Sequence, residues 1–231
     1  VIGIYLDAFP TGVLALSTRP GDWTDRGRQG LERLGIAHEV WETAQLRHHL
    51  PQFAIADETV GIFTVRGGAL FPDRIATDLA HLLRQSGVAL VPREKVIAIE
   101  PTQGRVVTES GAVFLADRIL YSGGAWAPGL VPELANLLTP YRQCILYAAE
   151  PAKWQRAWAE TPVLVDLGGE TGCYAIPPVA GSDLKICAPD HRRRGDPDRD
   201  AALDENDEPA IRGFFRPSLP DIDDYRLLYL K

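Results

Sequence analysis

Methionine is absent from this sequence of 231 residues, and cysteine occurs only three times. Cys144, Cys173 and Cys187 are odd in number and widely spaced, so they predict neither a disulfide framework nor a CxxC metal site, and we expect no bound metal. This cysteine usage favours a reducing compartment, and we expect a cytoplasmic protein. Because even an initiator methionine is missing, we interpret the sequence as an internal segment of a longer protein.

Long apolar runs and an excess of positive charge are also lacking. No run approaches the roughly 18 apolar residues that a membrane-spanning helix needs, and the amino end lacks the pattern of a secretory signal, so we expect no membrane partner. The 24 basic residues are outnumbered by 31 acidic ones, which argues against a nucleic-acid partner. We interpret the one basic run, residues 191–194, as a solvated loop, because Asp196 and Asp198 follow it closely.

The glycine fingerprint GxGxxG, which holds the pyrophosphate of a bound dinucleotide, is missing as well. If a dinucleotide binds, the loop that holds its pyrophosphate lies outside this sequence. What is present is enough apolar material for a substantial core, since 45% of the residues are hydrophobic.

The first half of the sequence has both strand-like and helix-like patterns. Residues 1–6 and 12–16 predict two strands that pair across a turn at 9–12. Three stretches have helical spacing of apolar residues and a capping residue at one end or both: 25–34 before Gly35, 43–50 with Thr43 as N-cap, and a helix from Pro72 to Gly87. Short strands are expected after the third helix, at 88–91, 96–99, 105–108 and 112–115.

A buried strand is predicted next, over residues 117–122, and it stops at Gly123 and Gly124. A double glycine at that place indicates a turn or a close approach to a ligand, although an ordinary loop that leads into a helix fits the same residues. The second half is mostly strand-like, with strands expected at 144–149, 163–167, 173–176, 184–188 and 225–230 and a helix at 208–215. Together these patterns predict an α+β fold.

Several short motifs, in this order and spacing, resemble the FAD-dependent amine oxidases of the D-amino-acid-oxidase superfamily, and most of all its sarcosine oxidase and N-methyltryptophan oxidase branch. The motifs are Thr11–Leu14, Gly68–Phe71, Gly123–Trp126, Pro140–Gln143, and Tyr174–Lys185 running on to Asp196–Asp198. The resemblance implies that residues 61–139 are part of a Rossmann-like FAD-binding domain. It assigns residues 1–60 and 140–231 to a substrate domain with a mixed or antiparallel sheet.

The same resemblance implies which residues lie near FAD. The backbone of Val96 would contact the adenine part, and Ser122, Gly123, Gly124 and Trp126 would pass close to the nucleotide. Glycine suits that passage because a Cβ atom would hold the backbone away from the cofactor.

Lys185 and Tyr174 are the two catalytic candidates that the resemblance implies. A lysine at the place of Lys185 lies beside the flavin in relatives and promotes electron transfer to oxygen, because an ammonium stabilises the negative charge that develops there. Tyr174 would line the substrate cavity over the flavin. From the residues alone, a lysine that reaches solvent at the end of a strand and a tyrosine packed on a sheet remain open alternatives.

The sequence departs from the family pattern in two ways. A histidine that relatives often have four residues after the lysine is replaced here by Pro189, and His191 comes two residues later. The cysteine that binds the flavin covalently in some relatives falls one residue beyond Lys231, and the arginine that binds the substrate carboxylate falls before Val1.

The implied function is oxidation of the C–N bond of an amine, amino acid or N-methyl amino acid by FAD. Molecular oxygen would be the acceptor, and an imine and hydrogen peroxide would be the products. Two alternatives stay open: a dehydrogenase of the same superfamily that uses another acceptor, and a non-catalytic remnant that only folds or binds a partner.

Overall fold

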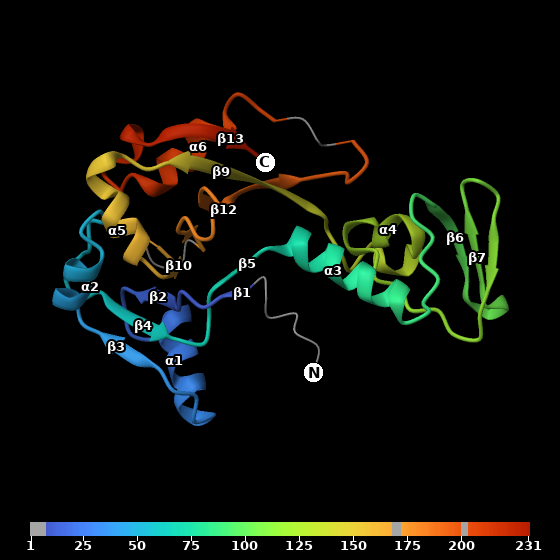
Figure 1. The fold of residues 1–231 in the computed structure, drawn as a ribbon, viewed down its shortest axis with the longest axis horizontal. Helices are drawn as coiled ribbons and strands as arrows, with labels where there is room; N and C mark the ends of the chain where they lie inside the picture. Colours follow the sequence, from blue (N-terminus) through green and yellow to red (C-terminus); the bar gives the residue numbers. More distant parts are fainter. Residues whose placement is uncertain (1–7, 168–171, 200–202) are drawn as a thin grey trace. The chain divides into compact units, whose positions relative to one another are not determined.

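The computed structural model describes residues 8–167, 172–199 and 203–231 (Figure 1). The chain divides into two compact units. The larger unit takes its residues from 1–72, 143–192 and 202–231, and the smaller unit from 73–142 and 193–201. The expected functional domains, 1–60, 61–139 and 140–231, stay a prediction.

The larger unit is built on a mixed eight-stranded sheet. Its strand order is β13-β9-β12-β11-β10-β2-β4-β3. The pair of β10 and β2 is parallel, whereas β2 with β4, β3 with β4, and β10 with β11 are antiparallel. The strands are β2 (Val13–Ser17), β3 (Glu39–Trp41), β4 (Val60–Thr64), β9 (Tyr141–Ala149), β10 (Val163–Val165), β11 (Tyr174–Ile176), β12 (Leu184–Arg194) and β13 (Arg226–Leu230). The predicted α+β fold with a mixed sheet is confirmed.

A second, two-stranded sheet pairs β1 (Ala8–Phe9) with β5 (Ala69–Leu70) in antiparallel register. The expected strand over residues 1–6, and its pairing with 12–16, lie outside the described residues. The described part of that prediction, a strand near 12–16, is confirmed by β2, which pairs instead with β4 and β10.

The hydrophobic core lies on one face of the large sheet, under helices α2 (Thr43–His49), α5 (Gln155–Glu160) and α6 (Asp207–Phe215). At its centre Trp158 of α5 is completely buried, and its Nε1 donates a hydrogen bond of 2.9 Å to the Tyr225 hydroxyl. Burial raises the pKa of Tyr225 to about 12. The phenol therefore stays protonated and can keep this contact at neutral pH.

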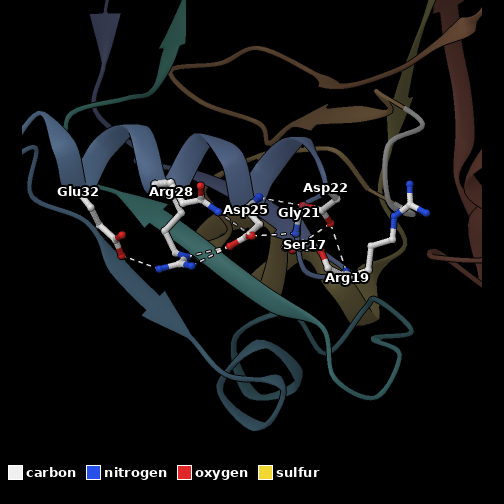
Figure 2. A network of polar contacts seen from close by, with 8 residues as sticks. Ser17, Arg19, Gly21, Asp22, Asp25, Arg28 and Glu32 are labelled. Atoms are coloured by element: carbon white, nitrogen blue, oxygen red, sulfur yellow. Dashed lines mark hydrogen bonds and ion pairs between the residues drawn. The ribbon is translucent and has the colours of Figure 1, made fainter.

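Helix α1 (Trp23–Arg33) begins at a buried aspartate, as Figure 2 shows. Asp22 accepts hydrogen bonds at 2.8–2.9 Å from the backbone N–H of Asp25 and Thr18 and from the Ser17 hydroxyl. Burial by itself would raise the pKa of Asp22, but these hydrogen bonds together hold it below the ordinary value of 3.8. One carboxylate thus joins the end of β2 to the start of α1. Farther along α1, Arg28 pairs with Asp25 and Glu32.

Helix α2 has a different N-cap from the one predicted. The N-cap is Glu42, whose side chain and that of Gln45 form a capping box, and the predicted cap Thr43 is the first helical residue. The Thr43 hydroxyl instead donates a hydrogen bond of 2.8 Å to the carbonyl of Thr59. A tertiary contact has therefore overridden a local preference.

The smaller unit contains α3 (Pro72–Gln85) from residue 73 onward, the antiparallel sheet β6-β7-β8, and α4 (Ala127–Leu130). The sheet strands are β6 (Val96–Glu100), β7 (Arg105–Thr108) and β8 (Val113–Leu115), as the sequence predicted. Helix α3 begins at Pro72 and is followed by Gly87, also as predicted. None of its residues is buried, although its apolar residues share one face.

Two predicted strands of the smaller unit are absent from the structure. Residues 88–91 and 117–122 are described but form no strand, and Leu120, expected to be buried, is 92% exposed. An isolated extended segment forms no ladder of hydrogen bonds, and none of the described strands pairs with either segment. An apolar run identifies a strand only where a neighbouring strand is present.

The basic run 191–194 was wrongly predicted to be a loop, since it forms the end of β12. Just beyond it, the Gly195 N–H donates a hydrogen bond of 3.2 Å to the carbonyl of Pro140, the residue before β9. His191 Nε2 lies 2.8 Å from a carboxylate oxygen of the buried Asp207. Charged residues that follow a buried strand can therefore prolong it.

Among the helices of the described segments, none has the length and apolar character needed to cross a bilayer.

We predict that Asp22→Ala lowers the free energy of unfolding by about 1–2 kcal/mol at neutral pH, because α1 loses its cap. Since the folded-state pKa lies below 3.8, the stabilisation is complete above pH 3.8 and is lost as pH falls through the lowered value. Urea denaturation at neutral and acidic pH measures both effects. The control Asp57→Ala, whose side chain is 90% exposed, should change stability by less than about 0.5 kcal/mol. Equal losses for the two variants would contradict the assignment.

Candidate functional site

A cavity of about 610 Å³ in the smaller unit brings together three of the five residues that were expected near a nucleotide. Val96, Gly123 and Trp126 all line it. The other two, Ser122 and Gly124, flank Gly123 in the chain, are exposed, and are absent from the described wall of the cavity. The structure therefore gathers part of the expected set at one place, and its volume is typical of small-molecule pockets.

The strand that forms one wall of this cavity has an irregularity. The register between β6 and β7 shifts between Val96 and Ala98, so Ile97 has no direct partner across the ladder. A bulge of this kind leaves backbone groups without ladder bonds and turns them away from the sheet. Val96 and Ile97 both line the cavity. This geometry suits the expected contact between the Val96 backbone and a heteroaromatic ring.

The two glycines of the turn serve different purposes. A Cβ atom at Gly123 would collide with the ring and hydroxyl of Tyr121, so glycine at this position lets that ring lie against the turn. Gly124 has a φ of +54°, which other residues rarely adopt, and open space lies around it. The Tyr121 hydroxyl oxygen is buried, and no partner for it is found among the described residues. Tyr121 is also one of the residues that line the cavity.

Asp198 is a residue of this cavity to which the sequence reasoning gave no role. Its carboxylate accepts a hydrogen bond of 3.0 Å from Trp126 Nε1 and lies 3.4 Å from Lys95 Nζ. The hydrogen bond from Trp126, followed by the charge of Lys95, lowers the pKa of Asp198 below 3.8. The Asp196–Asp198 motif was the only sequence signal, and its partner Trp126 lies 72 positions away in the chain.

These features fit the adenine and ribose part of FAD. The walls formed by Val96, Ile97 and Trp126 offer flat and apolar surfaces for a ring. The buried Tyr121 hydroxyl and the Asp198 carboxylate offer polar partners for ring nitrogens or sugar hydroxyls.

The two predicted catalytic residues, Tyr174 and Lys185, meet in the larger unit. In the antiparallel pair of β11 and β12, Tyr174 lies opposite Cys187 and Ile176 lies opposite Lys185. These four side chains share one face of the sheet, because residues two apart in a strand point the same way. Ala175 and Ile186, between them in the chain, are fully buried in the core on the other face.

Lys185 is partly buried, and its Nζ lies 5.4 Å from the centre of the Tyr174 ring. A cation over the face of an aromatic ring is attracted by the ring electrons. Burial lowers the pKa of Lys185 below 10.5, and Lys231 adds to this effect, whereas Cys187 opposes it. Burial also raises the pKa of Tyr174 strongly, so this phenol stays neutral. The role of Lys185 in catalysis stays a prediction.

A second cavity, of about 440 Å³, lies beside Tyr174 in the larger unit. Its walls include Trp23, Val165 and the buried Asp166. Asp166 accepts weak hydrogen bonds from the Thr24 hydroxyl at 3.4 Å and from the Gly172 N–H at 3.3 Å. An aromatic and apolar wall with one carboxylate is thus available next to the Lys185–Tyr174 pair.

His191 does not take the place of the histidine that Pro189 replaces. Its Nε2 contacts Asp207 of α6, and the Asp207 carboxylate also accepts a hydrogen bond of 2.8 Å from the Asp204 N–H. This histidine therefore has a structural partner at the end of β12.

Comparison with known proteins identifies a family and several relatives. The family described as FAD dependent oxidoreductase (DAO) matches residues 2–229. Peroxisomal sarcosine oxidase of Mus musculus is 27% identical over 54% of this chain and 32% of its own length. N-methyl-L-tryptophan oxidase of Yersinia pestis (strain Pestoides F) is 21% identical over 63% of this chain and 39% of its own.

Among solved structures, L-proline dehydrogenase from P. horikoshii has the same fold, with a TM-score of 0.77. It is 14% identical in sequence, and the match covers 98% of this chain and 60% of that one. The chain therefore spans about a third of the length of the curated relatives, and more than half of that structure. Since the family match extends over nearly every residue, the chain belongs to the FAD dependent oxidoreductases of the DAO family.

Proposed function

We propose that the whole protein oxidises the C–N bond of an amino acid or N-methyl amino acid and passes the electrons through FAD to molecular oxygen. Carbon loses a hydrogen with two electrons and nitrogen loses a proton, so that C–N becomes C=N. Oxygen takes up two electrons and two protons and becomes hydrogen peroxide. Bound FAD supplies the intermediate two-electron acceptor. The resulting imine hydrolyses in water.

The observation that carries this proposal is the placement of the Lys185 ammonium over the Tyr174 ring on the open face of the sheet. A positive charge in a partly desolvated place stabilises negative charge that develops on oxygen much better than it would in water. Tyr174 stays neutral and presents an aromatic face and a hydroxyl to a substrate. The cavity beside Tyr174 has room for a small amine.

The cavity of the smaller unit supports the assignment of residues 61–139 to FAD binding. In this proposal Val96, Ile97 and Trp126 hold the adenine ring, and Ser122, Gly123 and Gly124 form the turn that the nucleotide passes. Residues 1–60 and 140–231 then form the substrate domain. The three described cysteines form no disulfide, which fits the reducing compartment, such as the cytoplasm, that we propose.

A dehydrogenase with a different electron acceptor is the second candidate. The fold similarity to L-proline dehydrogenase favours it, since that structure matches with a TM-score of 0.77. The two candidates differ in whether the reduced protein consumes oxygen. An oxygen electrode, with sarcosine as the amine and a dye acceptor as the comparison, separates them. Dye reduction without oxygen uptake would overturn the oxidase proposal.

We predict that Lys185→Met slows reoxidation of the reduced flavin by oxygen about 100-fold, because the charge next to the reacting oxygen is lost. Stopped-flow absorbance of the reduced protein mixed with oxygen measures this rate. The matched control is Lys153→Met, which removes a surface lysine paired with Asp221 and Asp224. An unchanged oxygen rate in Lys185→Met would show that this ammonium has no such role.

The rate with oxygen should also depend on pH. Because burial lowers the pKa of Lys185 below 10.5, the active ammonium form is lost as pH rises through a value below 10.5. The oxygen rate should therefore fall on that alkaline side. Lys185→Arg keeps its charge over this range, so its profile should be flat. Identical profiles for the two proteins would exclude Lys185 as the titrating group.

Asp198→Ala should weaken FAD binding by about tenfold, because Trp126 loses the partner that fixes its ring. Quenching of protein fluorescence during titration of the flavin-free whole protein with FAD measures the affinity. Asp117→Ala, an exposed acidic residue of the same unit that does not line the cavity, is the control. Equal affinities for the two variants would contradict the role of the Trp126–Asp198 contact.

A further inference from the structure

The cavity of about 440 Å³ beside Tyr174 is larger than a compound of the size of sarcosine needs. Pockets that hold larger ligands have volumes of roughly 300–1,000 Å³, and this cavity lies within that range. Its described wall is formed by Trp23, Val165, Asp166, Gly172 and Tyr174. If the reacting end of a substrate lies against Tyr174, the cavity therefore has room for a side chain that extends away from the reaction.

Asp166 carries the only carboxylate in the described wall of this cavity, and it is 4% exposed. One of its carboxylate oxygens accepts a hydrogen bond of 3.4 Å from the Thr24 hydroxyl, and the other accepts one of 3.3 Å from the Gly172 N–H. Among the described residues, no cation forms an ion pair with it. A buried carboxylate with two long hydrogen bonds from neutral donors is poorly compensated for its lost hydration, so a positive charge beside it is stabilised.

The backbone holds this carboxylate in place. Asp166 directly follows β10 and has a φ of +58°, a left-handed conformation that aspartate tolerates better than most residues do. Thr24 is buried in the first turn of α1, so the hydroxyl that contacts Asp166 belongs to a regular element. The carboxylate thus lies where the end of β10 and the start of α1 meet.

Two aromatic side chains of the same wall also suit a cation. Trp23, the first residue of α1, lines the cavity and is 58% exposed. Tyr174 stays neutral, because burial raises its pKa strongly. The face of either ring can attract an ammonium group. Lys185 Nζ lies 5.4 Å from the centre of the Tyr174 ring but is not part of the described wall, so the charge that this wall offers a ligand is negative.

The reacting nitrogen of the substrate is a poor partner for this carboxylate. When C–N becomes C=N, the nitrogen contributes its lone pair to the new bond, so it has to react as the neutral amine. A carboxylate close to that nitrogen would favour its protonated form and slow the reaction. Asp166 therefore fits a second, charged nitrogen at the far end of the substrate side chain.

We propose that the cavity beside Tyr174 is a side-chain pocket in which Asp166 binds a positively charged amino group, so that the substrates are amino acids or N-methyl amino acids with a basic side chain. This substrate class rests on the proposed function. The binding of an organic cation by Asp166 does not, and it can be measured without any reaction.

The first experiment compares the binding of butylammonium and of butanol, its neutral counterpart, to the FAD-loaded whole protein. Saturation-transfer NMR titrations give both dissociation constants. Butylammonium should bind about tenfold more tightly, because the buried carboxylate attracts its charge. Asp166→Asn keeps the size of the side chain and a hydrogen-bond acceptor, and it should remove this difference. The control Asp57→Asn alters a side chain that is 90% exposed and outside the described wall, and it should leave the difference unchanged.

Equal binding of butylammonium and butanol by the unaltered protein would overturn the proposal, and this comparison does not depend on whether any variant folds. A tenfold preference that persists in Asp166→Asn would overturn it too, since the cation would then be held by another group.

The second experiment measures flavin reduction in the absence of oxygen, which does not depend on the electron acceptor. Nα-methyl-lysine and Nα-methyl-norleucine have carbon chains of equal length, and only the first ends in an ammonium group. The substrate concentration for half-maximal rate should be about tenfold lower for Nα-methyl-lysine, and Asp166→Asn should abolish this preference. An equal or lower value for Nα-methyl-norleucine in the unaltered protein would overturn the substrate class.

Failure of this proposal is distinguishable from failure of the proposed function. If sarcosine and both N-methyl amino acids leave the flavin oxidised, the proposed function and the substrate class are wrong, and the butylammonium titration still decides whether Asp166 binds a cation. If the flavin is reduced but Asp166→Asn binds butylammonium as the unaltered protein does, the proposed function stands and the role of Asp166 is wrong.

Discussion

The alternation of side chains along β11 and β12 is the constraint on which the larger unit depends. Ala175 and Ile186 point into the core, so Tyr174, Lys185 and Cys187 must point to the other face. A shift of one residue in this register would bury the ammonium among leucines and expose the apolar residues, at a large cost in free energy. Core packing therefore also orients the polar residues. The contacts that stabilise the fold are the same contacts that place the candidate catalytic side chains on the other face of the sheet.

The smaller unit presents backbone and ring surfaces at one cavity. The bulge at Ile97, the Tyr121 ring against Gly123, and the Trp126–Asp198 contact each shape one wall of its cavity. Segments distant in the sequence meet there, since Asp198 comes from a stretch after β12 while Trp126 precedes β9. The fit to the adenine and ribose part of FAD rests on this combination of flat apolar walls and a few polar groups.

Much of this fold could be predicted from the sequence, and the failures share a physical cause. Periodicity located α1, α3, α6 and most strands. The family resemblance pointed to Val96, Gly123 and Trp126, which line one cavity, and to Lys185, and the roles of these residues stay predictions. The apolar run 117–122 and the residues 88–91 were wrongly predicted to be strands, because strand formation depends on a partner that a local pattern does not reveal. Thr43 was wrong as a cap for a similar reason, since the carbonyl of Thr59 competes for its hydroxyl. Asp198 and Asp166 could not be assigned, because their contacts with Trp126 and Thr24 exist only after folding.

Helix α3 has a property that bears on how the chain behaves in solution. Its apolar residues Ile75, Leu79, Leu82 and Leu83 share one stripe, yet no residue of the helix is buried. Contact between such a stripe and another apolar surface, including the same stripe on a second molecule, lowers the free energy because it removes apolar area from water. Self-association of this chain through that stripe is therefore expected to respond to concentration, salt and mild surfactants.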